Sequence, residues 1–87
     1  MIKSWSDRAW DDYLWWLNND KINFKKINNL IKNIDRNDYY GIGEPELLKY
    51  GLSGWWSRKI TKKDRIIYRI IDNSIEIASC KGHYDDK

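Results

Sequence analysis

Three side chains of this sequence could together perform acid-base chemistry on a phosphodiester. Glu46 could accept a proton, Arg65 could stabilise negative charge on a crowded phosphorane, and His83 could donate a proton to a departing oxygen. RNA needs these three actions when its own 2′-hydroxyl attacks the adjacent phosphate, and none of them requires a metal ion. The combination is therefore compatible with RNA cleavage.

Each of these residues also has an ordinary structural interpretation. His83 stands near the end of the sequence, where a single histidine is commonly an inert surface residue. Glu46 could stabilise the N-terminus of a helix, and Arg65 could be a surface arginine on a strand. Trp55 and Trp56 indicate core and rim packing, although exposed aromatic rings among basic residues can stack on bases. Taken singly, these residues do not establish a function.

Other catalytic classes receive little support. The sequence has no Asp/Glu cluster of a two-metal nuclease, no glycine-rich phosphate loop and no convincing Ser/His/Asp set. Cys80 is the single cysteine, so an internal disulfide is impossible and zinc-ligand spacing is absent. We expect no cofactor and a reducing, cytoplasmic location. The chain also lacks an apolar signal core and any apolar run long enough to cross a bilayer.

Charge is distributed unevenly along the chain. The formal net charge of +3 is modest and would not by itself identify a nucleic-acid binder. Between residues 49 and 69, a single aspartate accompanies these basic residues: Lys49, Arg58, Lys59, Lys62, Lys63, Arg65 and Arg69. The segment could face a polyanion, or it could be a solvated surface that keeps the domain soluble.

The elements that must position these residues can be predicted from caps and periodicity. The length of 87 residues indicates one domain over residues 1–87. Residues 2–5 alternate like a short strand, after which Ser6 and Asp20 can cap two successive helices. Helical spacing in the first helix predicts an inner face of Ala9, Tyr13, Trp16 and Leu17, widened by Trp10 and Leu14. The second helix should bury Phe24, Ile27, Leu30, Ile31 and Ile34. The two helices should form an antiparallel hairpin.

The second half of the chain indicates strands. Residues 37–44 contain turn formers and predict a loop. Residues 45–51 begin with a proline and end with a glycine. They predict a short helix that carries Glu46 and Lys49. Strands are expected at residues 55–60, 65–71 and 75–81, with a hairpin turn at residues 72–74.

This order, β-α-α-β-β-β, predicts an α+β fold with an antiparallel meander. The helical hairpin should cover one face of the sheet and leave the other face for a ligand. Alternation along residues 65–71 turns Arg65 and Arg69 to one face, which we expect to be the solvent side, and Ile66 and Tyr68 to the other.

An ordered series of motifs resembles a known family. They are Glu44-Pro45-Glu46-Leu47-Leu48-Lys49, Leu52-Ser53-Gly54-Trp55-Trp56-Ser57-Arg58-Lys59-Ile60, Asp64-Arg65-Ile66-Ile67-Tyr68 and His83-Tyr84. Earlier in the chain stand Trp10-Asp11-Asp12-Tyr13-Leu14 and Lys25-Lys26-Ile27-Asn28 with Leu30-Ile31. These motifs span nearly the whole chain. Through them the chain resembles the YoeB family, which belongs to the wider RelE group of toxins.

The resemblance implies a RelE-like fold and a type II toxin-antitoxin system. It implies a metal-independent mRNA interferase that cuts messenger RNA in the ribosomal A site and so inhibits translation. The implied partners are a cognate antitoxin of the YefM type, the ribosome with its message, and a second copy in a homodimer. Contact with DNA is expected only through the antitoxin complex, and contact with membranes is not expected.

The resemblance also implies roles for individual residues. Glu46 corresponds to the general base and His83 to the general acid, while Arg65 would stabilise the phosphorane. Tyr84 would orient the substrate or the acid. The residues expected to help bind the substrate are Lys49, Arg58 and Lys59.

Three features depart from the family pattern. Lys59 stands where arginine is common, so a two-pronged phosphate contact becomes a point charge. Gly82 stands where an aromatic residue is common and could loosen the segment before His83. The chain also continues past Tyr84 through residues 85–87, which include two carboxylates.

Two other functions remain as alternatives. One is a non-enzymatic toxin on the same scaffold, like the ParE proteins that poison gyrase, although the presence of Glu46, Arg65 and His83 argues against it. The other is an RNA-binding module without a catalytic step, which would use Trp55, Trp56 and the basic strands.

Overall fold

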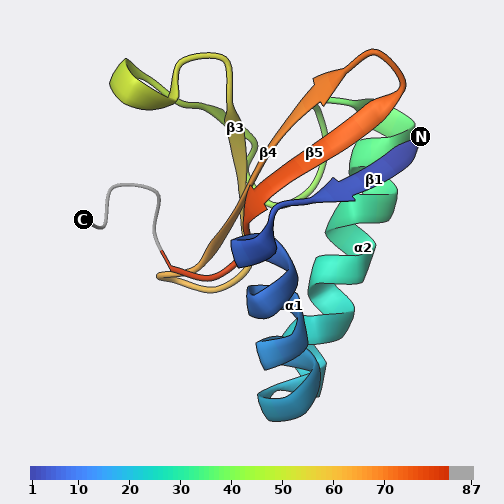
Figure 1. Cartoon of the computed structure of the whole chain (residues 1–87), viewed down its shortest axis with the longest axis vertical. Helices are drawn as coiled ribbons and strands as arrows, with labels where there is room; N and C mark the ends of the chain where they lie inside the picture. The colour runs from blue at the N-terminus through green and yellow to red at the C-terminus, as the bar shows by residue number, and fades with distance from the viewer. Residues whose placement is uncertain (83–87) are drawn as a thin grey trace.

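The computed structural model describes residues 1–82 of the chain (Figure 1). Within that range, the elements in chain order are β1 (Ile2–Trp5), α1 (Asp7–Asn19), α2 (Lys21–Asn37), β2 (Glu46–Leu47), β3 (Trp56–Lys59), β4 (Arg65–Ile71) and β5 (Ser74–Ser79). A 3-10 segment at Tyr50–Leu52 lies between β2 and β3. The predicted α+β class is confirmed.

The strands of the described range form one sheet in the order β1-β5-β4-β3-β2. β2 to β5 pair antiparallel as expected, whereas β1 pairs parallel with β5 and makes the sheet mixed. The first strand of the chain thus lies beside the last described one (Figure 1). No helix among residues 1–82 is long and apolar enough to cross a membrane.

Both helices begin at the predicted caps. The Ser6 hydroxyl accepts a hydrogen bond from the Ala9 N–H at 3.0 Å, and Asp20 Oδ1 accepts one from the Asn23 N–H at 3.1 Å. The hydrogen bonds from Asn23 also hold the pKa of Asp20 below its ordinary value. Asp20 ends α1 and begins α2, so the chain reverses within one residue and the helices form the expected hairpin.

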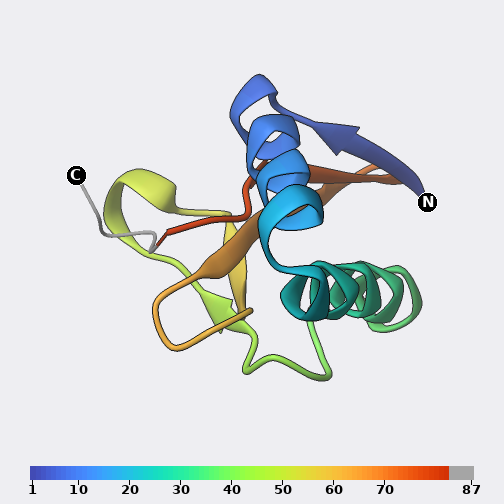
Figure 2. The same cartoon turned by 90° about the horizontal axis from the view of Figure 1, so that it is seen from below.

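The helices pack on one face of the sheet, and the 3-10 segment lies on the other side (Figure 2). The α2 stripe predicted from helical spacing is buried, with Phe24 partly so. It meets the inward side chains of β4 and β5, which include Ile66, Tyr68, Ile75 and Ile77. In α1, Ala9 and Trp16 are buried, whereas Leu17 is 38% exposed and Trp10 is 46% exposed. The hairpin therefore keeps apolar side chains at the surface.

The short helix predicted at residues 45–51 is wrong. Glu46 and Leu47 instead form the two-residue strand β2, which pairs with Ser57 and Trp56 of β3. The Leu48 N–H donates to the Trp55 carbonyl at 2.9 Å, which extends this pairing. Cross-strand hydrogen bonds and the burial of Leu48 override the helix signals of a proline followed by a glycine.

Candidate active site

Four polar residues share the face of the sheet that the helices leave uncovered. The strand register pairs Glu46 with Ser57, and Lys59 with Arg65. Residues opposite each other on neighbouring strands point to the same side, so these side chains gather on one face. The fold thereby brings together Glu46, Lys59 and Arg65, three of the residues expected to act on RNA.

Arg65 is oriented by three neighbours. Its Nε donates to Ser57 Oγ at 2.8 Å, and its Nη2 donates to the Glu44 carbonyl oxygen at 3.0 Å. The same Nη2 lies 3.7 Å from Glu46 Oε1. Arg65 is on the predicted face, but its side chain is only 12% exposed rather than open to solvent. A guanidinium held in this way is preorganised to stabilise charge at a fixed position.

Lys59 lies in register with Arg65 and carries a second positive charge. Its Nζ is 3.5 Å from Glu44 Oε2, and the Glu44 side chain is 76% exposed. Exposed ion pairs of this kind contribute only about 0 to 1 kcal/mol. Lys59 could therefore exchange Glu44 for another anion at little cost.

Lys49 lies at the rim of the same face. It is exposed, and it lines with Glu46 and Tyr50 a small hollow of about 260 Å³. Tyr50 is 91% exposed and has a φ of 60°, an uncommon conformation for a residue with a side chain. The rim of the hollow thus presents an ammonium group and an aromatic ring next to Glu46.

Arg58 does not occupy the surface position that a substrate contact needs. Its side chain is fully buried on the helix-facing side of β3. Its Nε donates to the Tyr68 hydroxyl at 3.1 Å, and its Nη1 donates to Asn33 Oδ1 at 2.5 Å. The remaining hydrogen bonds run to the carbonyls of Ile42 at 3.1 Å, Asp38 at 2.9 Å and Tyr40 at 2.8 Å.

The Arg58 guanidinium thus anchors the loop between α2 and β2. Its five N–H groups match the five hydrogen bonds, so the buried cation is satisfied by carbonyl, hydroxyl and amide oxygens. The loop passes close above it at Gly43, whose φ is 84° and where a Cβ would lie 3.2 Å from Arg58 Cβ. This anchored loop carries Glu44 to Arg65 and leads into Glu46.

His83 and Tyr84, the expected acid and orienting residue, lie outside the described residues. The residue before them is described. Gly82 accepts a hydrogen bond from the Arg65 N–H at 3.0 Å and donates one to Asp64 Oδ1 at 2.8 Å. Gly82 itself is therefore held beside Arg65 by two hydrogen bonds.

Comparisons with known proteins show the family to which the chain belongs. Residues 5–84 match the family described as the YoeB-like toxin of bacterial type II toxin-antitoxin systems. Toxin YoeB of Escherichia coli strain K12 is 51% identical over 80 residues, which cover 92% of this chain and 95% of that protein. The chain belongs to the YoeB-like toxin family.

Solved structures of the family share the fold. One is the heterotetrameric YoeB-YefM toxin-antitoxin complex from Staphylococcus aureus, with a TM-score of 0.90, 48% identity and coverage of 97% of this chain and 98% of that chain. Another is the YoeB dimer from Staphylococcus aureus, with a TM-score of 0.90, 48% identity and the same coverage. The RelE-like architecture expected from the motifs is confirmed.

In this YoeB-like toxin, sequence reasoning missed three residues that shape the site. Ser57 and Glu44 orient Arg65, and Asp64 binds the Gly82 amide. Alternation along residues 56–60 could have revealed Ser57, since it faces the same side as Lys59. No local pattern marks the contact of Glu44 with Arg65 or that of Asp64 with Gly82, because each joins segments that are distant in sequence.

Proposed function

We propose that this toxin is a ribosome-dependent mRNA endoribonuclease that cuts messages in the ribosomal A site and stops translation. The observation that carries the proposal is the approach of Glu46 and Arg65 to 3.7 Å on the open sheet face, while the Arg65 backbone binds Gly82 just before His83. Arg65 thus contacts the proposed base through its side chain and the residue before the proposed acid through its backbone.

The proposed reaction needs only these side chains. The Glu46 carboxylate takes the proton of the 2′-hydroxyl, and the 2′-oxygen attacks the adjacent phosphorus. Arg65 binds the non-bridging oxygens of the phosphorane as charge develops on them. His83 gives a proton to the 5′-oxygen as the P–O bond breaks, which leaves a 2′,3′-cyclic phosphate and a 5′-hydroxyl. Tyr84 would orient the substrate or His83.

Two lysines would hold the RNA backbone around the reacting phosphate. Lys59, in register with Arg65, would exchange Glu44 for a phosphate oxygen. Lys49, at the rim of the hollow beside Glu46, would contact a neighbouring phosphate. Arg58 is left out of this set, because its guanidinium is buried and fully engaged.

The alternative of a plain RNA-binding module finds less support. Such a module would offer Trp55 and Trp56 as stacking platforms. The Arg69 guanidinium lies over the Trp55 ring at 4.4 Å, and the Tyr39 ring stacks on Trp56 at 4.6 Å. Both tryptophans are thereby engaged within the protein. The gyrase-poison alternative does not account for Glu46 and Arg65 meeting on one face.

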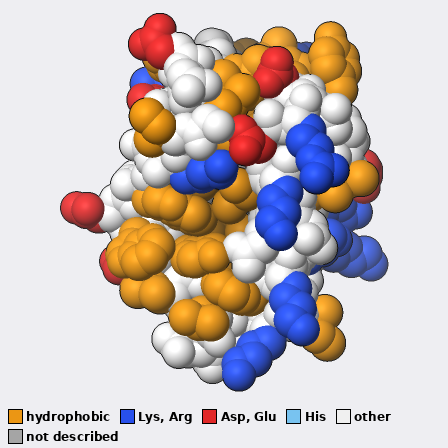
Figure 3. All heavy atoms as spheres, turned by 90° about the vertical axis from the view of Figure 1, so that its right-hand side faces the viewer, with side chains coloured by type: hydrophobic (Ala, Val, Ile, Leu, Met, Phe, Trp, Pro, Cys, Tyr) orange, Lys and Arg blue, Asp and Glu red, His pale blue; other side chains and the backbone are white. Residues whose placement is uncertain are grey.

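We further propose a YefM-like antitoxin as the cognate partner and a homodimer as the assembly, in the cytoplasm. The relatives from Staphylococcus aureus described as a YoeB-YefM complex and a YoeB dimer support this. A surface for such contacts is the helical hairpin, where Trp10, Leu17 and Ile22 are exposed. Figure 3 shows apolar side chains gathered beside lysine and arginine side chains on one face of the molecule.

The decisive experiment maps message ends on translating ribosomes with and without the purified toxin. We expect new ends in A-site codons, with cyclic or 3′-phosphate termini, also when EDTA is added at a level that preserves ribosomes. Production of the toxin alone should stop growth, and co-production of the antitoxin should restore it. Intact messages in the presence of abundant soluble toxin would contradict the proposal.

A further inference from the structure

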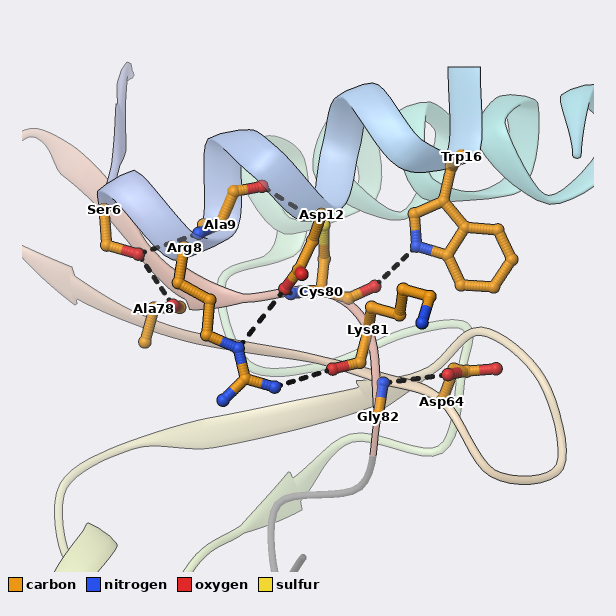
Figure 4. Close-up of polar contacts among 10 residues, drawn as sticks. All are labelled: Ser6, Arg8, Ala9, Asp12, Trp16, Asp64, Ala78, Cys80, Lys81 and Gly82. Carbon is orange, nitrogen blue, oxygen red and sulfur yellow. Dashed lines mark hydrogen bonds and ion pairs between the residues drawn. The ribbon is translucent and has the colours of Figure 1, made fainter. Parts of the chain in front are cut away.

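The last described residues are bound along their backbone by α1 (Figure 4). The Cys80 N–H donates to Asp12 Oδ2 at 3.0 Å, and the Cys80 carbonyl accepts from the Trp16 indole N–H at 2.8 Å. The Lys81 carbonyl accepts from the Arg8 guanidinium at 3.0 Å. The segment that leaves β5 is therefore held against the first helix.

Gly82 depends on a different pair of residues. Asp64 binds its N–H and the Arg65 N–H binds its carbonyl, so two successive residues hold the two ends of Gly82. Cys80 is additionally fixed by its buried side chain, but Gly82 has no side chain to pack and has a φ of 89°. Its position consequently rests on its backbone contacts.

The Asp64 carboxylate is itself fixed in place. Asp64 is only 8% exposed, and its Oδ2 accepts a hydrogen bond from the Thr61 hydroxyl at 2.6 Å. The Thr61 Oγ in turn accepts from the Asp64 N–H at 3.0 Å. The Asp64 carbonyl accepts from the Ile60 N–H at 2.8 Å, which closes the turn between β3 and β4. The other carboxylate oxygen, Oδ1, accepts the hydrogen bond from the Gly82 N–H, so this bond comes from a side chain whose orientation is fixed (Figure 4).

We propose that Asp64 is a positioning residue for the proton donor of the cleavage reaction. The proposal rests on the assignment of His83 as general acid. A peptide group is planar, so the hydrogen bond from the Arg65 N–H fixes the orientation of the peptide group that carries the Gly82 carbonyl. Asp64 fixes the preceding plane through the Gly82 N–H. The unit Asp64-Arg65 therefore supplies the catalytic guanidinium and also anchors the chain from which the acid extends.

The expected effect follows from the geometry of proton transfer. A displacement of about 1 Å at a reacting group can slow an enzyme by about 100-fold. Asp64→Ala removes the acceptor of the Gly82 N–H, so we expect single-turnover cleavage on ribosomes to slow by about 10- to 100-fold with ribosome binding unchanged. Asp64→Asn keeps an oxygen that can accept this hydrogen bond, and its rate should stay within a few-fold of the wild-type rate.

Asp12→Ala is the matched control. Asp12 anchors Cys80, which its buried side chain and the Trp16 hydrogen bond continue to hold. We expect this variant to lower the melting temperature with little change in the cleavage rate of the folded protein. A larger loss of rate in Asp12→Ala than in Asp64→Ala would overturn the proposal.

A double variant tests whether Asp64 acts through His83. Asp64→Ala should slow the wild-type protein but add no loss to His83→Gln, because residues that act as one unit are not additive. Multiplied losses would overturn the positioning role. If His83→Gln alone cut at the wild-type rate, the general-acid assignment would fail, and the role proposed for Asp64 with it.

Amide hydrogen exchange of Gly82, followed by NMR, tests the anchor without any reference to activity. The Gly82 amide should exchange slowly in the wild type and in Asp64→Asn, and faster in Asp64→Ala. If Asp64→Ala does not fold, Thr61→Val, which removes the hydroxyl that orients the carboxylate, should give faster exchange and a smaller loss of rate. Unchanged exchange in whichever of these two variants folds would overturn the proposal even where cleavage is confirmed.

Discussion

The Arg65 Nε donates to the buried Ser57 hydroxyl at 2.8 Å, so the guanidinium approaches Glu46 in a fixed orientation. The hydrogen bond links the two central members of the open sheet face across β3 and β4. Because one nitrogen is bound to Ser57 and another to the Glu44 carbonyl, the plane of the guanidinium is set by the protein and not by the substrate.

Arg65→Ala should lower cleavage more than Lys49→Ala, since Lys49 is an exposed ammonium at the rim and Arg65 is preorganised. Loss of one transition-state donor typically costs about 3 to 4 kcal/mol, or about 100- to 1000-fold in rate. Arg65→Lys should recover little, because one ammonium cannot reproduce a planar fork. Single-turnover assays on programmed ribosomes measure these rates. Equal, small losses in Arg65→Ala and Lys49→Ala would remove Arg65 from the reacting phosphate.

Glu46→Gln and His83→Gln should separate binding from chemistry. Each substitution introduces a neutral amide that cannot transfer the proton. Loss of a proton-transfer group typically lowers the rate by about 100- to 10,000-fold. Both proteins should therefore sediment with ribosomes as the wild type does while leaving the message intact. Lys63→Ala, which changes an exposed residue, serves as the control. A His83→Gln protein with wild-type activity would pass the acid role to Tyr84 or to the ribosome.

Arg58→Met should destabilise the toxin, even though it reduces the repulsion between like charges in the basic segment. The change removes the guanidinium from three loop carbonyls and from the Asn33 oxygen, of which, within residues 1–82, only the Asp38 carbonyl and the Asn33 oxygen accept another hydrogen bond, from the Tyr68 hydroxyl and the Ile42 N–H. Leaving a buried acceptor without a donor typically costs about 1 to 3 kcal/mol. Urea denaturation should show this loss, whereas Lys62→Ala, at an exposed residue of the same segment, should shift the midpoint little. Near-equal midpoints would contradict the anchoring role of Arg58.

Cys80 should resist thiol reagents in the folded protein. Burial, together with the nearby Asp12 carboxylate, raises the pKa of Cys80 from 9.0 to about 12. Since the folded state holds this proton more tightly, the contribution of Cys80 makes unfolding easier as pH rises above the ordinary thiol pKa of 9.0. Iodoacetamide labelling should follow global unfolding, and Cys80→Ala should lose less stability between pH 8 and 10. Rapid labelling of the native protein would show that the residue is accessible.

Local signals predicted the framework well because they are local in origin. Ser6 and Asp20 form the caps that their types predict, and the stripe on α2 faces the core. Strand β4 has the predicted bounds. Its alternation also placed Arg65 correctly on the face away from the helices.

The predictions fail where contacts between segments distant in sequence determine the local structure. Pairing with Ser57 makes Glu46 part of a strand, which the proline and glycine around it did not indicate. Arg58 was placed with the surface charges, although it alternates with Trp56 and Ile60 toward the core. The five hydrogen bonds that permit its burial come from segments that lie 10 to 25 residues away. No pattern near Arg58 could have revealed them.

The parallel pairing of β1 with β5 has a consequence for synthesis of the toxin. Lys3 lies in register with Ile75, and the Arg8 contact with Lys81 joins residues 73 positions apart. The N-terminal strand emerges first from the ribosome and has no strand to pair with until the last part of the chain follows. Contacts this distant in sequence form slowly, because the intervening chain must be ordered first. The sheet and the anchor of Gly82 therefore close only after residues 74–82 have emerged, so a nascent chain that still lacks them does not yet carry an assembled site.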